Sequence, residues 1–241
     1  MFDLDGTLLK LRPTSEEAFL SYCADLGLDL NDETRRRLIR WSYKHWADNR
    51  ALITNDERQL GQEALIEKHL PFFLEDLDIG KIPEEEFLAH ISARFRDDFS
   101  PRRYLVPGAK ELLRDLKEAE LKLGLVSNRD EELSGAATEM GIIEYFDFTL
   151  AAGQVGSWKP DPAIFRHALR LGGDVPPQET IYVGDNYYAD VVGARGVGMV
   201  AVLIDEHGAF PEAADECRVI SHLGDLRGLL PGLPAHSGRA T

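Results

Sequence analysis

The first residues of the chain place two carboxylates two positions apart. The stretch Asp3-Leu4-Asp5-Gly6-Thr7 follows two apolar residues. Residues i and i+2 of a strand share a face, so Asp3 and Asp5 at a strand end would point into one crevice, where open α/β sheets place their active sites. Such a pair suits acid–base chemistry or a hard cation. The alternative is a surface turn, because Asp-Gly is common in turns.

Three later segments also place polar residues where an apolar stretch ends or a helix begins. Ser127 closes the apolar run over 121–125 and precedes a helix start, where exposed backbone amides favour an anion. Lys159 comes just before a helix that Pro162 helps to start. The stretch Gly184-Asp185-Asn186-Tyr187-Tyr188-Ala189-Asp190 adds two carboxylates after another apolar strand.

Each of these segments has a structural alternative. Ser127 could be a helix N-cap, and Lys159 could be an ordinary surface lysine. Asp185 and Asn186 could form a loop turn, with Asp190 on an exposed helix face. Their joint occurrence in this order, each at an expected strand end, favours one shared site.

The elements that must position these residues alternate along the second half of the chain. We expect helices over 108–119, 130–140, 161–171 and 187–195, strands over 121–127, 146–151, 180–183 and 199–204, and a last strand and helix within 218–230. This alternation predicts right-handed βαβ units and an α/β fold with a Rossmann-like parallel sheet. Only two residues precede Asp3, so the central strand is expected to be cut short, through a misassigned start or a trimmed chain.

Residues 14–98 are expected to be almost continuous helix. Thr14 or Ser15 with Glu17 resembles a capping arrangement, and amphipathic spacing continues from about residue 31 and over 60–70 and 84–99. An insertion of roughly ninety residues is far longer than ordinary loops, which predicts a cap domain over the crevice. We therefore expect an α/β core of residues 1–12 and 103–230, a helical cap over 13–102 and a disordered tail over 231–241.

Composition narrows the class of protein. The 241 residues carry a formal net charge of -15, which disfavours nucleic acid and anionic membranes as partners. We expect no signal peptide, because position 1 already begins a strand, and no apolar run approaches the 18 or more residues of a membrane span. Cys23 and Cys217 match neither a zinc site nor a disulfide framework, so we expect a cytoplasmic protein. A monomer is expected, with a dimer as the alternative.

The whole pattern resembles the haloacid dehalogenase superfamily of hydrolases. Its Asp-x-Asp-x-Thr motif matches residues 3–7, and its Ser/Thr, lysine and Gly-Asp-x4-Asp motifs match Ser127, Lys159, Asp185 and Asp190. The helical insertion resembles the C1 cap of that superfamily. Leu-Leu-x-Leu-Arg at 8–12 and Gly-Asp-Asn-Tyr at 184–187 further resemble the haloacid dehalogenase-like hydrolase domain-containing protein 3 group.

This resemblance implies a Mg²⁺-dependent phosphatase acting on a phosphomonoester of a small soluble metabolite through an aspartyl-phosphate. It implies Asp3 as the nucleophile, Asp5 as the general acid and base, and Ser127, the Asn128 backbone amide and Lys159 as the groups that hold the phosphoryl oxygens. It also implies Mg²⁺ ligands from Asp3, the Asp5 backbone carbonyl and Asp185, supported by Thr7 and Asp190.

Other functions of the same fold are the alternatives: a phosphomutase, a phosphonatase, a dehalogenase or a non-catalytic binding protein. A dehalogenase needs neither a metal nor a second carboxylate, so Asp5 and Asp185 argue against it. A phosphonatase would require a cap lysine, for which Lys44 and Lys68 are candidates. A binding protein would be free to lose an acid or the lysine, and this chain retains them all.

Overall fold

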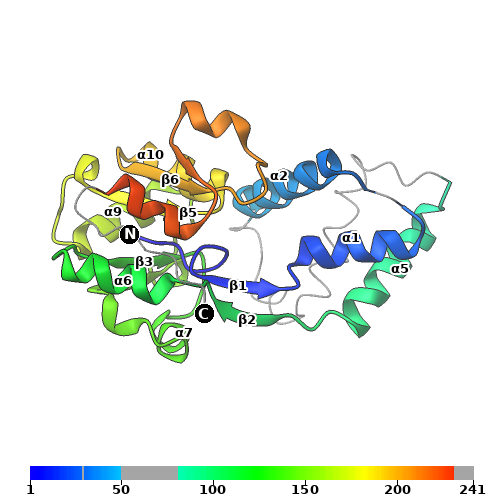
Figure 1. The fold of residues 1–241 in the computed structure, drawn as a ribbon, viewed down its shortest axis with the longest axis horizontal. Helices are drawn as coiled ribbons and strands as arrows, with labels where there is room; N and C mark the ends of the chain where they lie inside the picture. The colour runs from blue at the N-terminus through cyan, green and yellow to red at the C-terminus, as the bar shows by residue number, and fades with distance from the viewer. Residues whose placement is uncertain (29, 50–80, 231–241) are drawn as a thin grey trace. The chain divides into compact units, whose positions relative to one another are not determined.

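The chain forms two compact units in its computed structural model (Figure 1). The first unit comprises Met1–Lys10 with Tyr104–Thr241, and the second comprises Leu11–Arg103. The structure describes residues 1–28, 30–49 and 81–230. The helix expected over 60–70 and the tail expected over 231–241 lie outside these ranges.

A parallel sheet forms the centre of the first unit. Strand β3 (Gly124–Ser127) pairs with β4 (Phe148–Ala151), β5 (Ile181–Gly184) pairs with β6 (Val200–Ile204), and β6 pairs with β7 (Arg218–Ile220), all in parallel. Phe2 bridges Leu125 of β3 and Val183 of β5, so the first residues of the chain join the two halves of the sheet. The α/β class and parallel sheet predicted from the sequence are confirmed.

The first residues are held between β3 and β5 by backbone hydrogen bonds. Four bonds of 2.9 Å hold them: Phe2 N to Gly124 O, Val126 N to Phe2 O, Asp3 N to Val183 O, and Val183 N to Met1 O. In place of the expected central strand, Phe2 makes two isolated bridges, one to each neighbouring strand, rather than a continuous ladder. This bonding still places Asp3 at the carboxyl edge of the sheet, beside the ends of both neighbouring strands.

The helices of the first unit differ in length from those expected. They are α6 (Ala109–Glu118), α7 (Ser134–Glu139), α8 (Ala152–Val155), α9 (Pro162–Leu171) and α10 (Val192–Gly196), with 3₁₀ helices at Ile143–Tyr145, Pro177–Glu179, Pro211–Asp215 and Leu223–Leu229. The helix expected over 187–195 begins as a π-helix, Tyr187–Val191, and only then becomes α10. The last expected helix is the 3₁₀ segment ending at Leu229.

Apolar side chains fix these helices against the sheet. In α6, Leu112, Leu113 and Leu116 are buried and join Phe2 and Leu125 in one core cluster. Fully burying a leucine is worth about 1.5–3 kcal/mol relative to leaving it exposed, so this face of α6 holds the helix against the sheet.

The described part of the second unit is built from α1 (Ser15–Asp25), α2 (Asp32–Asn49) and α5 (Glu84–Asp97). Thr14 and Glu17 form a reciprocal capping box at the start of α1, as the sequence suggests. Buried side chains from all three helices share one core, including Phe19, Leu38 and Phe87. In the described residues, no helix combines the length and apolar character of a membrane span.

Two short strands were not expected from the sequence. Strand β1 (Leu9–Arg12) pairs with β2 (Arg102–Leu105), and the boundary between the two units passes through both. The residues of β2 are mostly exposed and include two adjacent arginines, so they lack the apolar alternation by which strands are recognised.

Candidate active site

A buried lysine lies between two buried aspartates at the carboxyl edge of the sheet. The Lys159 ammonium donates to Asp3 Oδ1 and to Asp190 Oδ1, each at 2.6 Å. The exposed fractions are 3% for Lys159, 5% for Asp3 and 1% for Asp190. Removing one member of a buried charged group leaves another unpaired at a cost of several kcal/mol, so these three side chains fix one another's positions.

The charges in this cluster shift the pKa values of its members. Burial alone would lower the pKa of Lys159, but the Asp190 and Asp3 carboxylates outweigh it and raise that pKa well above its usual value. Burial raises the pKa of Asp3; Lys159 opposes this effect, and the neighbouring carboxylates add to it. The two carboxylates therefore favour the charged form of the lysine, and a further positive charge beside Asp3 would favour the anionic form of Asp3.

Asn128 fixes the loop that carries the lysine. Its side-chain amide donates to the Lys159 carbonyl at 2.9 Å and its side-chain oxygen accepts from the Lys159 amide at 2.6 Å. Beneath the lysine, the Tyr182 hydroxyl donates to the Val126 carbonyl at 3.0 Å, and the Tyr182 ring centre lies 5.4 Å from the ammonium. Sequence reasoning assigned Asn128 only through its backbone amide and missed Tyr182, which reads as an ordinary strand aromatic.

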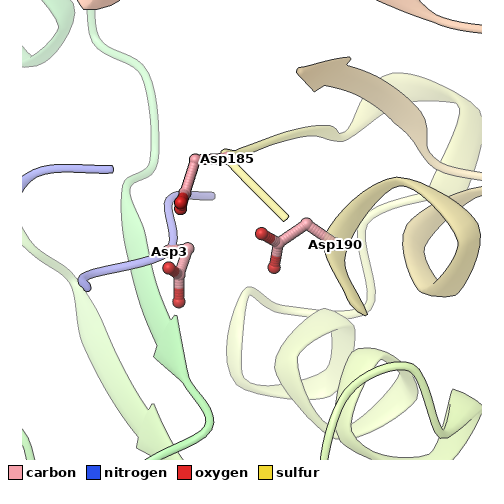
Figure 2. Close-up of side chains that lie close together, drawn as sticks. All are labelled: Asp3, Asp185 and Asp190. Carbon is pink, nitrogen blue, oxygen red and sulfur yellow. The ribbon is translucent and has the colours of Figure 1, made fainter. Parts of the chain in front are cut away.

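Three carboxylates form a group that fits a hard cation. Asp3, Asp185 and Asp190 each offer an oxygen, and these atoms lie within 4.8 Å of one another (Figure 2). Asp185 Oδ1 accepts from the Thr7 hydroxyl at 2.9 Å. Asp190 instead bonds Lys159 through Oδ1 and the Asn186 amide through Oδ2 at 3.0 Å. An all-oxygen donor set of this kind suits Mg²⁺. Both carboxylate oxygens of Asp190 already accept hydrogen bonds, one from Lys159 and one from its own loop.

Two glycines allow this close packing of carboxylates. Gly6 has a φ of +88°, and a Cβ there would lie 2.1 Å from Asp185 Oδ2. A Cβ on Gly184 would lie 2.2 Å from Asp190 Oδ2. Any side chain at either position would displace a carboxylate, which explains the glycine that follows Asp5 and the one that precedes Asp185.

Asp5 lies in a different environment from Asp3. Its side chain is half-exposed and accepts two hydrogen bonds from Arg129: Nε to Oδ2 at 2.7 Å and Nη2 to Oδ1 at 2.6 Å. The buried Ser127 hydroxyl approaches Asp5 Oδ2 at a longer 3.4 Å. The structure thus brings the half-exposed Asp5 together with Ser127 and Arg129, while the buried Asp3 lies with Lys159.

Arg129 was missed by sequence reasoning. Its one signal is its place two residues after Ser127, in a loop that leaves a strand end. Of the two lysines considered for a Schiff base, Lys44 forms an exposed ion pair with Asp48 in the second unit, and Lys68 lies outside the described residues.

Comparisons with known proteins agree on one family. The family model described as haloacid dehalogenase-like hydrolase matches residues 1–198. A human protein named haloacid dehalogenase-like hydrolase domain-containing protein 3 is 31% identical over 98% of this chain and 94% of its own. A phosphoglycolate phosphatase from Nitrosococcus oceani is 29% identical over 95% of each chain. The solved structure of a phosphatase of this family from Thermococcus onnurineus has a TM-score of 0.55 and 27% identity, covering 96% of this chain and 97% of that one.

Proposed function

The chain belongs to the haloacid dehalogenase-like hydrolases, and from this premise we propose that it is a Mg²⁺-dependent phosphatase of small phosphomonoesters. The observation that carries the proposal is the buried Lys159 bonded to Asp3, with the Asp185 carboxylate beside them. This arrangement offers a nucleophile, a fixed cation and a metal-binding carboxylate at one point. The phosphatase names of similar proteins support the same reaction class.

In the proposed first step, an Asp3 carboxylate oxygen forms a bond to phosphorus while the bond from phosphorus to the leaving oxygen breaks. Asp5 donates a proton to that leaving oxygen, so the product leaves as an alcohol. In the second step Asp5 takes a proton from water, the water oxygen bonds to phosphorus, and the bond to Asp3 breaks to release phosphate. The half-exposed position of Asp5 gives it access to both leaving group and water.

Positive charge and hydrogen-bond donors stabilise the phosphoryl oxygens in this proposal. Lys159 supplies the charge, and the Ser127 hydroxyl and Asn128 backbone amide supply donors from the end of β3. The hydrogen bonds between the Asn128 side chain and the Lys159 backbone hold the two loops that carry these groups at a fixed separation before substrate binds. Preorganised donors of this kind need no rearrangement during the reaction.

Asp3, the Asp5 backbone carbonyl and Asp185 would hold Mg²⁺, which when bound supplies positive charge beside the transferred phosphoryl group. Thr7 would support this site by holding Asp185, and Asp190 would support it by holding Lys159. We further propose that residues 13–102 serve as a C1 cap that selects the leaving group; the described helices of the second unit support this.

The test is phosphate release by the purified full-length chain from p-nitrophenyl phosphate and a panel of phosphorylated metabolites. Release should require Mg²⁺ and stop with EDTA. Thr7→Val keeps the shape of a buried side chain but removes the bond to Asp185, so it should raise the Mg²⁺ concentration needed for half-activation by about 10- to 100-fold. Asp215→Asn changes an exposed aspartate outside the site and should match wild type.

Two results would count against this function. One is release that persists at full rate after removal of divalent cations. The other is the absence of release from several dozen phosphomonoesters by protein that circular dichroism shows to be folded.

A further inference from the structure

We propose that Arg129 binds a second oxyanion on the substrate, a carboxylate or another phosphate, carried on the leaving group close to the scissile ester. The proposal rests on the phosphatase function above and names the class of substrate for the same site. Its starting point is the paired contact between the Arg129 guanidinium and Asp5, at 2.6 and 2.7 Å.

This contact places the guanidinium beside the carboxylate that serves the leaving group in the proposed function. Asp5 must reach the leaving oxygen to protonate it, whereas the phosphoryl group must lie over Asp3 and Lys159. A guanidinium bonded to both oxygens of Asp5 therefore lies beside the first atoms of the leaving group. An anion separated from the ester oxygen by one or two carbons would come within its reach.

Arg129 retains the capacity to bind such an anion while it holds Asp5. A guanidinium has five N–H donors in a planar fork, and the contact with Asp5 engages Nε and one hydrogen of Nη2. Three donors remain beyond this pair, and 24% of the side chain is exposed. Because the fork matches the geometry of carboxylate and phosphate oxygens, these donors are suited to a second oxyanion.

The backbone around Arg129 is fixed on both sides. The Arg129 carbonyl accepts from the Gly153 amide at 3.0 Å, and the preceding Asn128 is bonded to the backbone of Lys159. A Cβ on Gly153 would lie 2.2 Å from the Asp130 carbonyl oxygen, so a glycine is needed for this approach. The guanidinium therefore extends from a rigid loop, as a binding group must if it is to select by position.

The negative charge around the site means that an anionic leaving group needs a cation to bind there. The chain has a net charge of -15, and carboxylates surround the site, so an anionic leaving group would be repelled unless a cation faced it. Lys159 is committed to Asp3 and Asp190. Asp5, Asp3 and Glu131 are the acidic groups whose charges act on Arg129, and its hydrogen bond with Asp5 raises its pKa, so it stays a cation.

The experiment compares matched substrates that differ only in the second charge. The pairs are 2-phosphoglycolate with 2-phosphoglycolamide, and ethylene glycol bisphosphate with 2-hydroxyethyl phosphate. Wild type should show the higher kcat/KM for the charged member of at least one pair, and the pair that shows it identifies the oxyanion. Arg129→Gln should reduce this preference by about 10- to 100-fold, the range for a lost hydrogen bond to a charged group. Arg129→Lys keeps the positive charge but loses the planar fork of donors, so its preference for the charged substrate should lie between those of wild type and Arg129→Gln.

Arg166→Gln, an exposed arginine on α9, is the matched control and should leave the preference unchanged. An equal fall for both members of each pair in Arg129→Gln would show that Arg129 only positions Asp5, which overturns the inference. Phosphate release by wild type with no preference overturns the inference alone. No release from any ester overturns the proposed function as well. If Arg129→Gln does not fold, Arg129→Lys is measured instead. A reduced preference for the charged substrate in Arg129→Lys supports the inference, and an unchanged preference overturns it.

Discussion

At the scale of single residues, two aspartates only two positions apart acquire opposite environments. Asp3 is buried against the Lys159 ammonium, while Asp5 is half-exposed and held by Arg129 and Ser127. A buried carboxylate beside a lysine suits attack on phosphorus, and an accessible carboxylate suits proton exchange with the leaving group and water. The proposed division of roles therefore predicts different defects for the two conservative variants.

Asp3→Asn should abolish phosphate release and leave no phosphoenzyme, because the amide is a poor nucleophile of nearly the same shape. Asp5→Asn should slow turnover by about 10²- to 10⁴-fold, the usual contribution of general acid–base catalysis. It should still phosphorylate Asp3 slowly from p-nitrophenyl phosphate, whose leaving group needs little protonation. Acid quenching followed by mass spectrometry of the peptide from residues 1–10 measures the amount of phosphoenzyme in both variants. Phosphate found on Asp5, or on Asp3→Asn protein, would refute these roles.

At the scale of elements, the turn after Asp5 depends on a glycine for two separable reasons. Gly6→Ala would strain a positive φ and also drive a Cβ to 2.1 Å from Asp185. Gly27 has a similar φ of +77°, but a Cβ there would have nothing within 4 Å, so Gly27→Ala reports the backbone strain alone, about 1–2 kcal/mol. Gly6→Ala should lose more free energy of unfolding than Gly27→Ala, and should lose activity. Urea denaturation with a phosphatase assay tests this; equal losses and full activity would contradict it.

Asp147, the residue before β4, ties helix α6 to Leu123, the residue before β3. Its carboxylate accepts from the Leu123 amide at 2.7 Å and from Lys117 at 2.8 and 2.9 Å. Burial alone would raise the pKa of Asp147, but these bonds outweigh it and lower that pKa. The ionised form is thus the one that stabilises the folded state, so this contribution is present above the unfolded pKa of about 3.9 and is lost as pH falls through the folded value.

Asp147→Asn should therefore lower the free energy of unfolding at pH 7 by up to about 1 kcal/mol, a small value because the side chain is 39% exposed. The difference from wild type should shrink as pH falls below 4. Urea denaturation at pH 7, 5 and 3.5 measures it, with the exposed Asp215→Asn as control. A difference that stays constant or grows as pH falls would contradict this assignment.

At the scale of the whole molecule, the net charge of -15 places the folded chain under self-repulsion. Salt shortens the Debye length from about 30 Å at 0.01 M to about 10 Å at 0.1 M, which screens this repulsion. The exposed ion pairs that salt also weakens are worth little each. We therefore expect Tm to rise with NaCl from 10 to 200 mM in EDTA, by differential scanning calorimetry; a fall would show that ion pairs outweigh repulsion.

The sequence alone determined the α/β class, the parallel sheet and the order of the residues that meet at its carboxyl edge. Polar residues after apolar strands identify that edge, because parallel strands end on the same side of a sheet. The residues singled out in this way, Asp3, Lys159, Asp185 and Asp190, do lie together. Their catalytic roles remain predictions.

Only the tertiary structure decided which partner each side chain takes. Arg129 and Asp5 are 124 positions apart, and no local pattern reports that their side chains meet. The same holds for the two hydrogen bonds between the Asn128 side chain and the Lys159 backbone, for the Tyr182 ring beneath the lysine, and for the pairing of β1 with β2. Periodicity fixes the face of an element that is buried, whereas the direction of a side chain in a loop depends on the neighbours that packing brings to it.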